Sequence, residues 1–230
     1  MNLLDAVLDL LFPPKCPFCG MVQDKAGICS ACMSRLPWTD EDEYRELHGG
    51  LPCVAPLRYE GLTRDGIARL KFQGASTAAK PMGELLAQIV AERFAGMFDT
   101  VTWVPVSKKR LRERGYDQAE LLAQAACAAW ETQPVRLLKK VVNNPKQSSM
   151  GDATARYANV QGIFQAVHPE EVSGKRILLI DDVCTTGASL AECARVLREA
   201  GAKDVVCSVV AVPSPKRKCD TPCKNGLAIG

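Results

Sequence analysis

Residues 176–212 contain two apolar runs on either side of a helix-length segment, and this unit constrains the fold most strongly. RILLI at 176–180 and DVVCSVVAV at 204–212 are almost wholly Ile, Leu and Val with small residues, which predicts strands that are buried on both faces. The intervening ASLAECARVLREAGA at 188–202 predicts a helix that ends at Gly201, a residue type that commonly follows a helix. A strand, a helix and a second buried strand predict a parallel sheet.

The same alternation extends through most of the chain. Further strands are predicted at 52–60, 101–106 and 135–142, and helices at 62–72, 81–98 and 117–130. This order predicts an α/β fold with a parallel sheet. Residues 1–50 differ, because they combine a short helix, a cysteine cluster, the acidic stretch TDEDEYRE and a His-Gly-Gly-Leu-Pro linker. We therefore expect a small N-terminal module at 1–50 and a larger domain at 51–230.

The first residues, MNLLDAVLDLLFPP, predict an amphipathic helix and not a signal peptide. Asp5 and Asp9 interrupt the apolar run, and neither a basic region nor a small-residue cleavage site accompanies it. No segment approaches the roughly 18 apolar residues of a membrane span. We therefore expect a cytoplasmic protein without a membrane span, in which the eleven cysteines do not form a disulfide framework.

The segment DDVCTTGAS at 181–189 places two carboxylates and several small polar residues between a strand and a helix. The hydroxyls and backbone N–H groups of Thr185, Thr186, Gly187 and Ser189 lie at the positive end of the following helix, which suits a phosphate. Asp181 and Asp182 would repel that phosphate, but they could accept hydrogen bonds from the hydroxyls of a ribose. A sugar with a phosphate at one end fits both halves. The alternative is a helix cap with two solvated aspartates.

A basic stretch follows the strand predicted at 101–106. It places several cations within seven residues, where charge-assisted bonds to phosphate oxygens are strong: Lys108, Lys109, Arg110, Arg112 and Arg114. A solvated helix start or a nucleic-acid patch remains an alternative. The net charge of only +3 gives little support to a dedicated nucleic-acid surface.

The cysteine cluster has the spacing of a metal site. CPFCGMVQDKAGICSAC contains two Cys-x2-Cys pairs separated by nine residues, with Cys16, Cys19, Cys29 and Cys32 as ligands. Two such knuckles predict a tetrahedral structural Zn²⁺ site that supplies most of the folding energy of the module. A redox pair would need only one Cys-x-x-Cys, whereas a rubredoxin-like iron site uses similar knuckles and stays open. Cys219 and Cys223 have no assigned role.

LLIDDVCTTGAS closely resembles the loop of type I phosphoribosyltransferases that binds phosphoribosyl diphosphate (PRPP). VPVSKKRLRERGYDQAELLA at 104–123 resembles the corresponding segment of the ComF family, which includes competence proteins. The tetracysteine start and the downstream Arg156, Asn159, Gly162 and Phe164 also match. The resemblance implies a phosphoribosyltransferase fold behind a zinc module. It also implies that the loop after the strand at 101–106, with Ser107, Lys108, Lys109, Arg112 and Arg114, binds the diphosphate.

The segment 143–159 occupies the place of that family's catalytic lid. Its Gly, Ser, Asn and Pro content suits a loop, and the resemblance makes Lys146, Gln147 and Arg156 candidates for contacts with the departing diphosphate. An ordinary surface loop is the alternative.

Two functions follow from these patterns and from the resemblance. The first is a phosphoribosyltransferase that uses PRPP with Mg²⁺ and an unidentified acceptor, in a protein associated with the uptake or use of external DNA. The second is a non-enzymatic module that senses PRPP, or that contacts single-stranded DNA or a helicase or other DNA-processing partner. The acceptor and the oligomeric state are not encoded in any motif that we find.

Overall fold

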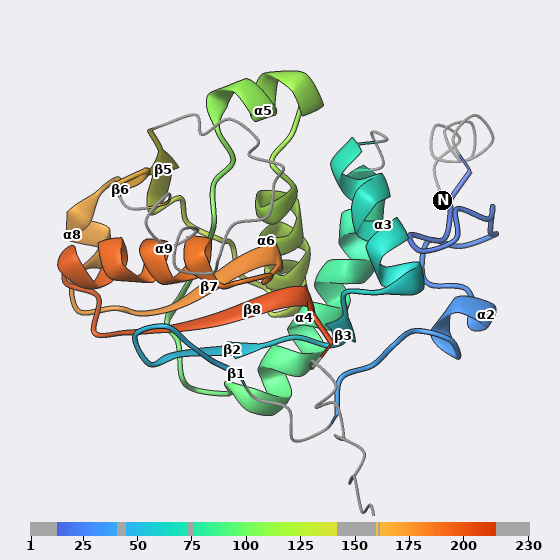
Figure 1. The fold of residues 1–230 in the computed structure, drawn as a ribbon, viewed down its shortest axis with the longest axis horizontal. Coiled ribbons are helices and arrows are strands. Elements are labelled where there is room, and N and C mark those ends of the chain that lie inside the picture. The colour runs from blue at the N-terminus through green and yellow to red at the C-terminus, as the bar shows by residue number, and fades with distance from the viewer. Residues whose placement is uncertain (1–12, 41–44, 73–75, 142–159, 161, 215–230) are drawn as a thin grey trace, which may run out of the picture.

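The computed structural model describes residues 13–40, 45–72, 76–141, 160 and 162–214 (Figure 1). Across these residues the centre is a six-stranded sheet, in which β2 (Leu51–Val54), β8 (Asp204–Val212), β7 (Arg176–Val183) and β4 (Thr100–Trp103) are parallel neighbours in that order. β1 (Arg45–Leu47) pairs antiparallel with β2 at one edge, and β3 (Leu57–Arg58) runs parallel to the end of β8. The predicted α/β fold is confirmed.

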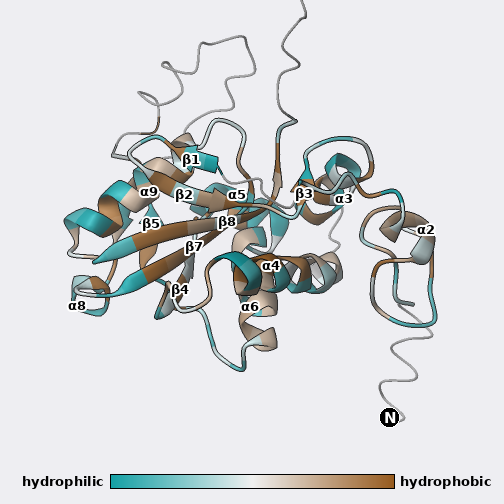
Figure 2. Cartoon of the chain, turned by 90° about the horizontal axis from the view of Figure 1, so that it is seen from below, coloured by the Kyte–Doolittle hydropathy of each residue, from teal (hydrophilic) through white to brown (hydrophobic). Residues whose placement is uncertain are grey.

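Helices cover both faces of this sheet. α3 (Gly61–Phe72), α4 (Ala79–Arg93) and α6 (Gln118–Ala129) pack on one face, and α9 (Ala188–Glu199) packs on the other. Leu178 and Ile180 of β7 join the first core, whereas Ile177 and Leu179 join the second. Figure 2 shows the apolar colour that runs along β7 and β8 between these layers. Burial on both faces is the reason why these two strands are nearly continuous apolar runs.

Some elements differ from the prediction. The strand expected at 52–60 is divided into β2 and β3 around Pro56, which lacks the N–H that a ladder needs. The strand expected at 135–142 is β5 (Leu138–Lys140), which pairs antiparallel with β6 (Phe164–Ala166) outside the main sheet. The sequence did not predict β1, β6, α2 (Ser30–Met33), η1 (Ser76–Ala78) or α8 (Pro169–Val172), and it offered the helix at α5 (Lys108–Arg114) only as an alternative. The helix expected at the N-terminus lies outside the described residues. None of the described helices combines the length and the apolar run needed to cross a bilayer.

The sheet brings two sequence motifs to the same edge. β4 and β7 are parallel neighbours, with Trp103 opposite Ile180. The segment that leaves β4 leads into α5, and the segment that leaves β7 leads into α9. Open parallel sheets bind ligands at this carboxyl edge, so we expect a ligand site at these two segments.

Candidate functional site

The first candidate site is the tetracysteine cluster. The Sγ atoms of Cys16, Cys19, Cys29 and Cys32 all lie within 4.8 Å of one another. Those of Cys19 and Cys29 are 3.8 Å apart, which matches a tetrahedral site with Zn–S bonds of about 2.3 Å. Burial raises the pKa of Cys16, but hydrogen bonds from neighbouring backbone N–H groups outweigh it and lower that pKa from its ordinary 9.0 to about 7. The donor set therefore fits a structural zinc ion.

The cysteine module docks on α3 through the side chain between its first two ligands. Phe18 is 0% exposed, and a Cβ placed on Gly66 would come within 2.8 Å of its ring. Arg69, also on α3, donates a hydrogen bond to the Phe18 carbonyl. Phe18 belongs to the same apolar core as Met82 of α4. The module and the α/β domain therefore share one core.

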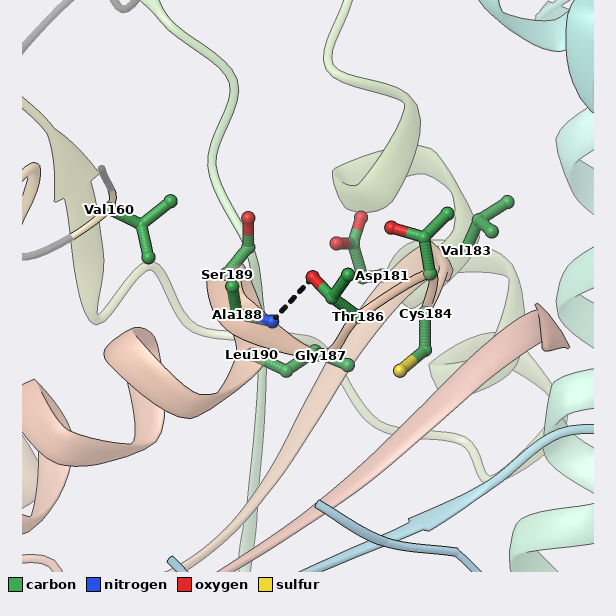
Figure 3. Close-up of a pocket in the computed structure, with 10 residues that line it drawn as sticks. Val160, Asp181, Val183, Cys184, Thr186, Gly187, Ala188, Ser189 and Leu190 are labelled. Carbon is green, nitrogen blue, oxygen red and sulfur yellow. Dashed lines mark hydrogen bonds between the residues drawn. The ribbon is translucent and has the colours of Figure 1, made fainter. Parts of the chain in front are cut away.

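The second candidate site is a pocket of about 250 Å³ at the carboxyl end of β7 (Figure 3). Besides Val160, its lining comes from the end of β7, the turn that follows and the start of α9: Asp181, Val183, Cys184, Thr185, Thr186, Gly187, Ala188, Ser189 and Leu190. Figure 3 shows the side-chain oxygens of Asp181 and Ser189 on one side of this turn, and the sulfur of Cys184 on the opposite side. The polar groups thus gather on the pocket side.

The turn requires glycine at position 187. Gly187 has a φ of +79°, and a Cβ there would lie 3.1 Å from the side chain of Leu47. Gly187 is the N-cap of α9 and has no side chain that could cap the helix, and the Ala188 N–H donates to Thr186 Oγ1 at a long 3.4 Å. Ser189 and Leu190, in the first turn of α9, line the pocket, and backbone N–H groups at such a helix start could bind a phosphate.

The two adjacent aspartates have different surroundings. β7 extends to Val183, so successive side chains alternate between the faces of the sheet. Asp181 is partly exposed and lines the pocket. Asp182 is 5% exposed and forms an ion pair with Lys71 of α3. Burial and the neighbouring Asp182 carboxylate raise the pKa of Asp181 well above its ordinary 3.8.

The basic residues of α5 also divide into two groups. Lys108, Lys109 and Arg112 are exposed, whereas Arg110 and Arg114 are half-buried. Burial and the nearby Arg110 lower the pKa of Arg114, and the same two causes lower the pKa of Lys140 on β5. Cations that lower one another's pKa in this way form a region that favours a bound anion. Arg110 belongs to the basic stretch but not to the diphosphate-binding set that the resemblance implies, although its i,i+4 spacing from Arg114 places the two on one helix face.

Other residues of the segment after β4 hold it in place. Ser107 is the N-cap of α5, and its Oγ accepts a hydrogen bond from Arg110 N–H at 3.3 Å. Asp117 caps α6 and also accepts from Val106 N–H at 2.9 Å, so it ties the two ends of the segment together. Burial raises the pKa of Asp117, against the effect of these backbone hydrogen bonds.

The pocket therefore collects five of the six residues predicted for the loop after β7, and Asp182 turns away to Lys71. The predicted lid residues Lys146, Gln147 and Arg156, and the unassigned Cys219 and Cys223, lie outside the described residues. Lys71 had no signal in the sequence, because it is far from the loop along the chain.

Comparison with known proteins defines the class. The phosphoribosyl transferase domain family matches residues 82–229, and the double zinc ribbon domain family matches residues 7–43. The chain belongs to the phosphoribosyl transferase domain family.

Its relatives are named for DNA use and competence. The DNA utilization protein YhgH of Salmonella typhi is 28% identical over 199 residues, covering 83% of this chain and 80% of that protein. The competence protein ComFC of Bacillus subtilis is 28% identical over 200 residues, covering 86% of this chain and 78% of that protein. The ComFC protein of Streptococcus pneumoniae is 27% identical, covering 87% of this chain and 82% of that protein. The kinship expected from the sequence motifs is confirmed.

Two solved structures show weaker likeness. Glutamine PRPP amidotransferase from Bacillus subtilis is 23% identical with a TM-score of 0.40, over 58% of this chain and 26% of that protein. PRPP synthetase from Mycobacterium smegmatis is 20% identical with a TM-score of 0.34, over 56% of this chain and 33% of that protein. This chain therefore spans only about a quarter to a third of these larger enzymes.

Proposed function

We propose that the pocket after β7 binds PRPP with Mg²⁺ and that the protein transfers the phosphoribosyl group to an acceptor. The observation that carries this proposal is one pocket in which the Asp181 carboxylate, the loop hydroxyls and the start of α9 come together. Acceptors of hydrogen bonds and a phosphate cradle are the two features that a phosphorylated ribose needs. The half-buried Arg110 and Arg114 follow the neighbouring strand β4, where they would meet the diphosphate.

Each group has a distinct part in this reaction. Asp181 accepts hydrogen bonds from the ribose hydroxyls, and Thr185, Thr186 and Ser189 donate to the 5′-phosphate. Arg110 and Arg114 neutralise charge on the diphosphate as it leaves C1. Mg²⁺ bound together with PRPP would supply further neutralisation of the diphosphate.

The Asp181 carboxylate beside the sugar also favours the positive charge that develops on the ring. Two further sets of residues complete this assignment. Lys108, Lys109 and Arg112 are candidates for outer contacts to the diphosphate, and Lys146, Gln147 and Arg156 remain our candidates for a lid over it.

The names of the relatives support a role in the uptake or use of external DNA, and we propose the cytoplasm as its location. Nothing in the pocket identifies the acceptor, so the assay must be open to several classes. Isotope-labelled PRPP should be incubated with the protein, Mg²⁺ and separate panels of nucleobases, nucleotides, single-stranded DNA and small amines. Release of labelled diphosphate that depends on one panel would identify the acceptor class.

Binding can be tested before the acceptor is known. Mg²⁺-PRPP at a hundredfold excess over Kd should stabilise the native state by about 2.7 kcal/mol, which corresponds to a rise in Tm of about 5–10 °C. ATP should give a smaller shift. Asp181→Asn should remove most of the PRPP shift, and the matched control Asp204→Asn, at the amino end of β8, should keep it. A wild-type protein that shows no shift with Mg²⁺-PRPP would contradict the proposal.

A non-enzymatic DNA-binding module is the second candidate, because three cations of α5 are exposed on its outer side. If they hold a nucleic-acid backbone, Lys108→Ala with Arg112→Ala should reduce the salt dependence of single-strand binding by about one unit of log–log slope. Arg110→Ala with Arg114→Ala should instead weaken PRPP binding. If the first double variant weakens only DNA binding and the second weakens only PRPP binding, the protein uses both ligands. If the Lys108→Ala, Arg112→Ala variant loses PRPP affinity and the Arg110→Ala, Arg114→Ala variant does not, the assignment of the two groups of cations to two ligands is refuted.

A further inference from the structure

Lys71 is the charged side chain that α3 brings to the edge of the PRPP loop. It lies one residue before the end of α3 (Gly61–Phe72), and its ammonium group pairs with the Asp182 carboxylate. The Lys71 side chain is 22% exposed and that of Asp182 is 7% exposed. The pair is therefore largely withdrawn from water and joins two elements that are distant in the sequence.

Asp182 needs this partner because of where β7 places it. The strand directs Asp182 to the same face as Leu178 and Ile180, toward the core shared with α3 and α4. A carboxylate in such surroundings is costly unless it is paired, and a second carboxylate, Asp181, is its direct neighbour. The charges that reach Asp182 come from Lys71 on α3, from Asp181 on β7 and from Arg114 on α5.

The end of α3 is itself fixed from two sides. Tyr116 donates a hydrogen bond to the Leu70 carbonyl, which is one of the carbonyls left without a helical partner at a helix end. The Arg114 guanidinium lies 5.0 Å from the centre of the Phe72 ring, a cation–π distance. Further back, Arg69 is bonded to the cysteine knuckle through the Phe18 carbonyl. Figure 1 shows this end of α3 beside α5.

We propose that Lys71 is a positioning residue of the PRPP site, which holds the Asp182 carboxylate against α3 and so leaves Asp181 alone to meet the ribose. This inference rests on the proposed function, since it assigns a residue to the same site. Lys71 acts through Asp182: it neutralises the inner carboxylate and holds it on the face of β7 that packs against α3. The cysteine module contributes indirectly, because it contacts the helix that carries Lys71.

The test compares PRPP affinity in wild type, Lys71→Met and the matched control Lys203→Met, whose lysine is exposed at the amino end of the sheet. Titration calorimetry with Mg²⁺-PRPP should show a loss of about tenfold or more for Lys71→Met and no loss for Lys203→Met. The Lys71 charge lowers the pKa of Asp181, so this pKa should rise further without the cation. The affinity of Lys71→Met should therefore keep rising with pH beyond the point at which wild type levels off. A merely structural lysine would not change this profile.

Two further variants test whether the positive charge is needed and whether Lys71 acts through Asp182. Lys71→Arg keeps the cation and should stay within about threefold of wild type. Lys71→Met combined with Asp182→Asn should bind no more weakly than Asp182→Asn alone, because the interaction is already removed. Circular dichroism of each variant confirms that it is folded, and Lys71→Arg serves as the decisive variant if Lys71→Met does not fold.

The outcomes are distinguishable. If wild type fails to bind Mg²⁺-PRPP, the proposed function is overturned, and this inference with it. If wild type binds and Lys71→Met binds equally well, only the role of Lys71 is overturned. Losses in Lys71→Met and Asp182→Asn that add in full would mean that Lys71 does not act through Asp182. A folded Lys71→Arg that loses as much affinity as Lys71→Met would show that the positive charge is not the property that counts.

Discussion

Replacement of Phe18 by alanine tests whether the zinc module and the α/β domain are one folding unit. Phe18 is 0% exposed and packs in the same core as Met82. Removing a buried phenyl ring costs about 3–5 kcal/mol, which is a large part of the roughly 5–15 kcal/mol that stabilises a typical domain. For a chain of this size the cost corresponds to a Tm lower by about 6–20 °C. Because the core is continuous, we expect the helices of the α/β domain to lose this stability as well.

Two probes of the zinc-loaded protein decide the matter. Far-ultraviolet circular dichroism follows the helices, and a chromogenic chelator follows release of the metal during the same thermal ramp. Both transitions should shift down together in Phe18→Ala. The matched control Met21→Ala removes a 65% exposed side chain from the same knuckle and should change stability by no more than about 0.5 kcal/mol. If zinc leaves earlier while the helices melt at the wild-type temperature, the module folds independently and our reasoning is refuted.

Three further predictions concern the two sites. Cys16→Ser should release one metal ion per chain, and elemental analysis of the fresh wild-type protein should find zinc; iron, or no metal, would contradict the assignment. Asp181→Asn should raise the Tm of the ligand-free protein, because the raised pKa of Asp181 means that ionising it opposes folding. This gain should grow as pH rises above 3.8, and a gain independent of pH would argue against this cause. Gly187→Ala should abolish the PRPP-dependent shift in Tm, because a Cβ at 187 is strained at a φ of +79° and lies 3.1 Å from Leu47; an unchanged shift would remove the turn from the site.

The features that the sequence predicted well are those with local physical causes. The helix and strand at 188–212 appear as α9 and β8 because apolar pattern and terminators act within the segment itself. The four zinc ligands are recognisable for the same reason, since their spacing is set by two short turns. The loop residues that line the pocket after β7 also follow one another along the chain.

The tertiary structure decided how distant segments meet. β7 pairs with β8 as far as Val183 and Ala211, and this pairing, not the loop sequence, separates Asp181 from Asp182. The segment 138–140 lies outside the main sheet because it pairs with β6 in a separate two-stranded sheet. The pairing of Lys71 with Asp182 and the contact of Phe18 with Gly66 both depend on where α3 packs in the fold. The sequence by itself determined which chemical groups stand at the ends of the strands, because spacing and residue type are local. The choice of partner for each group depended on packing between elements, which a linear pattern does not contain.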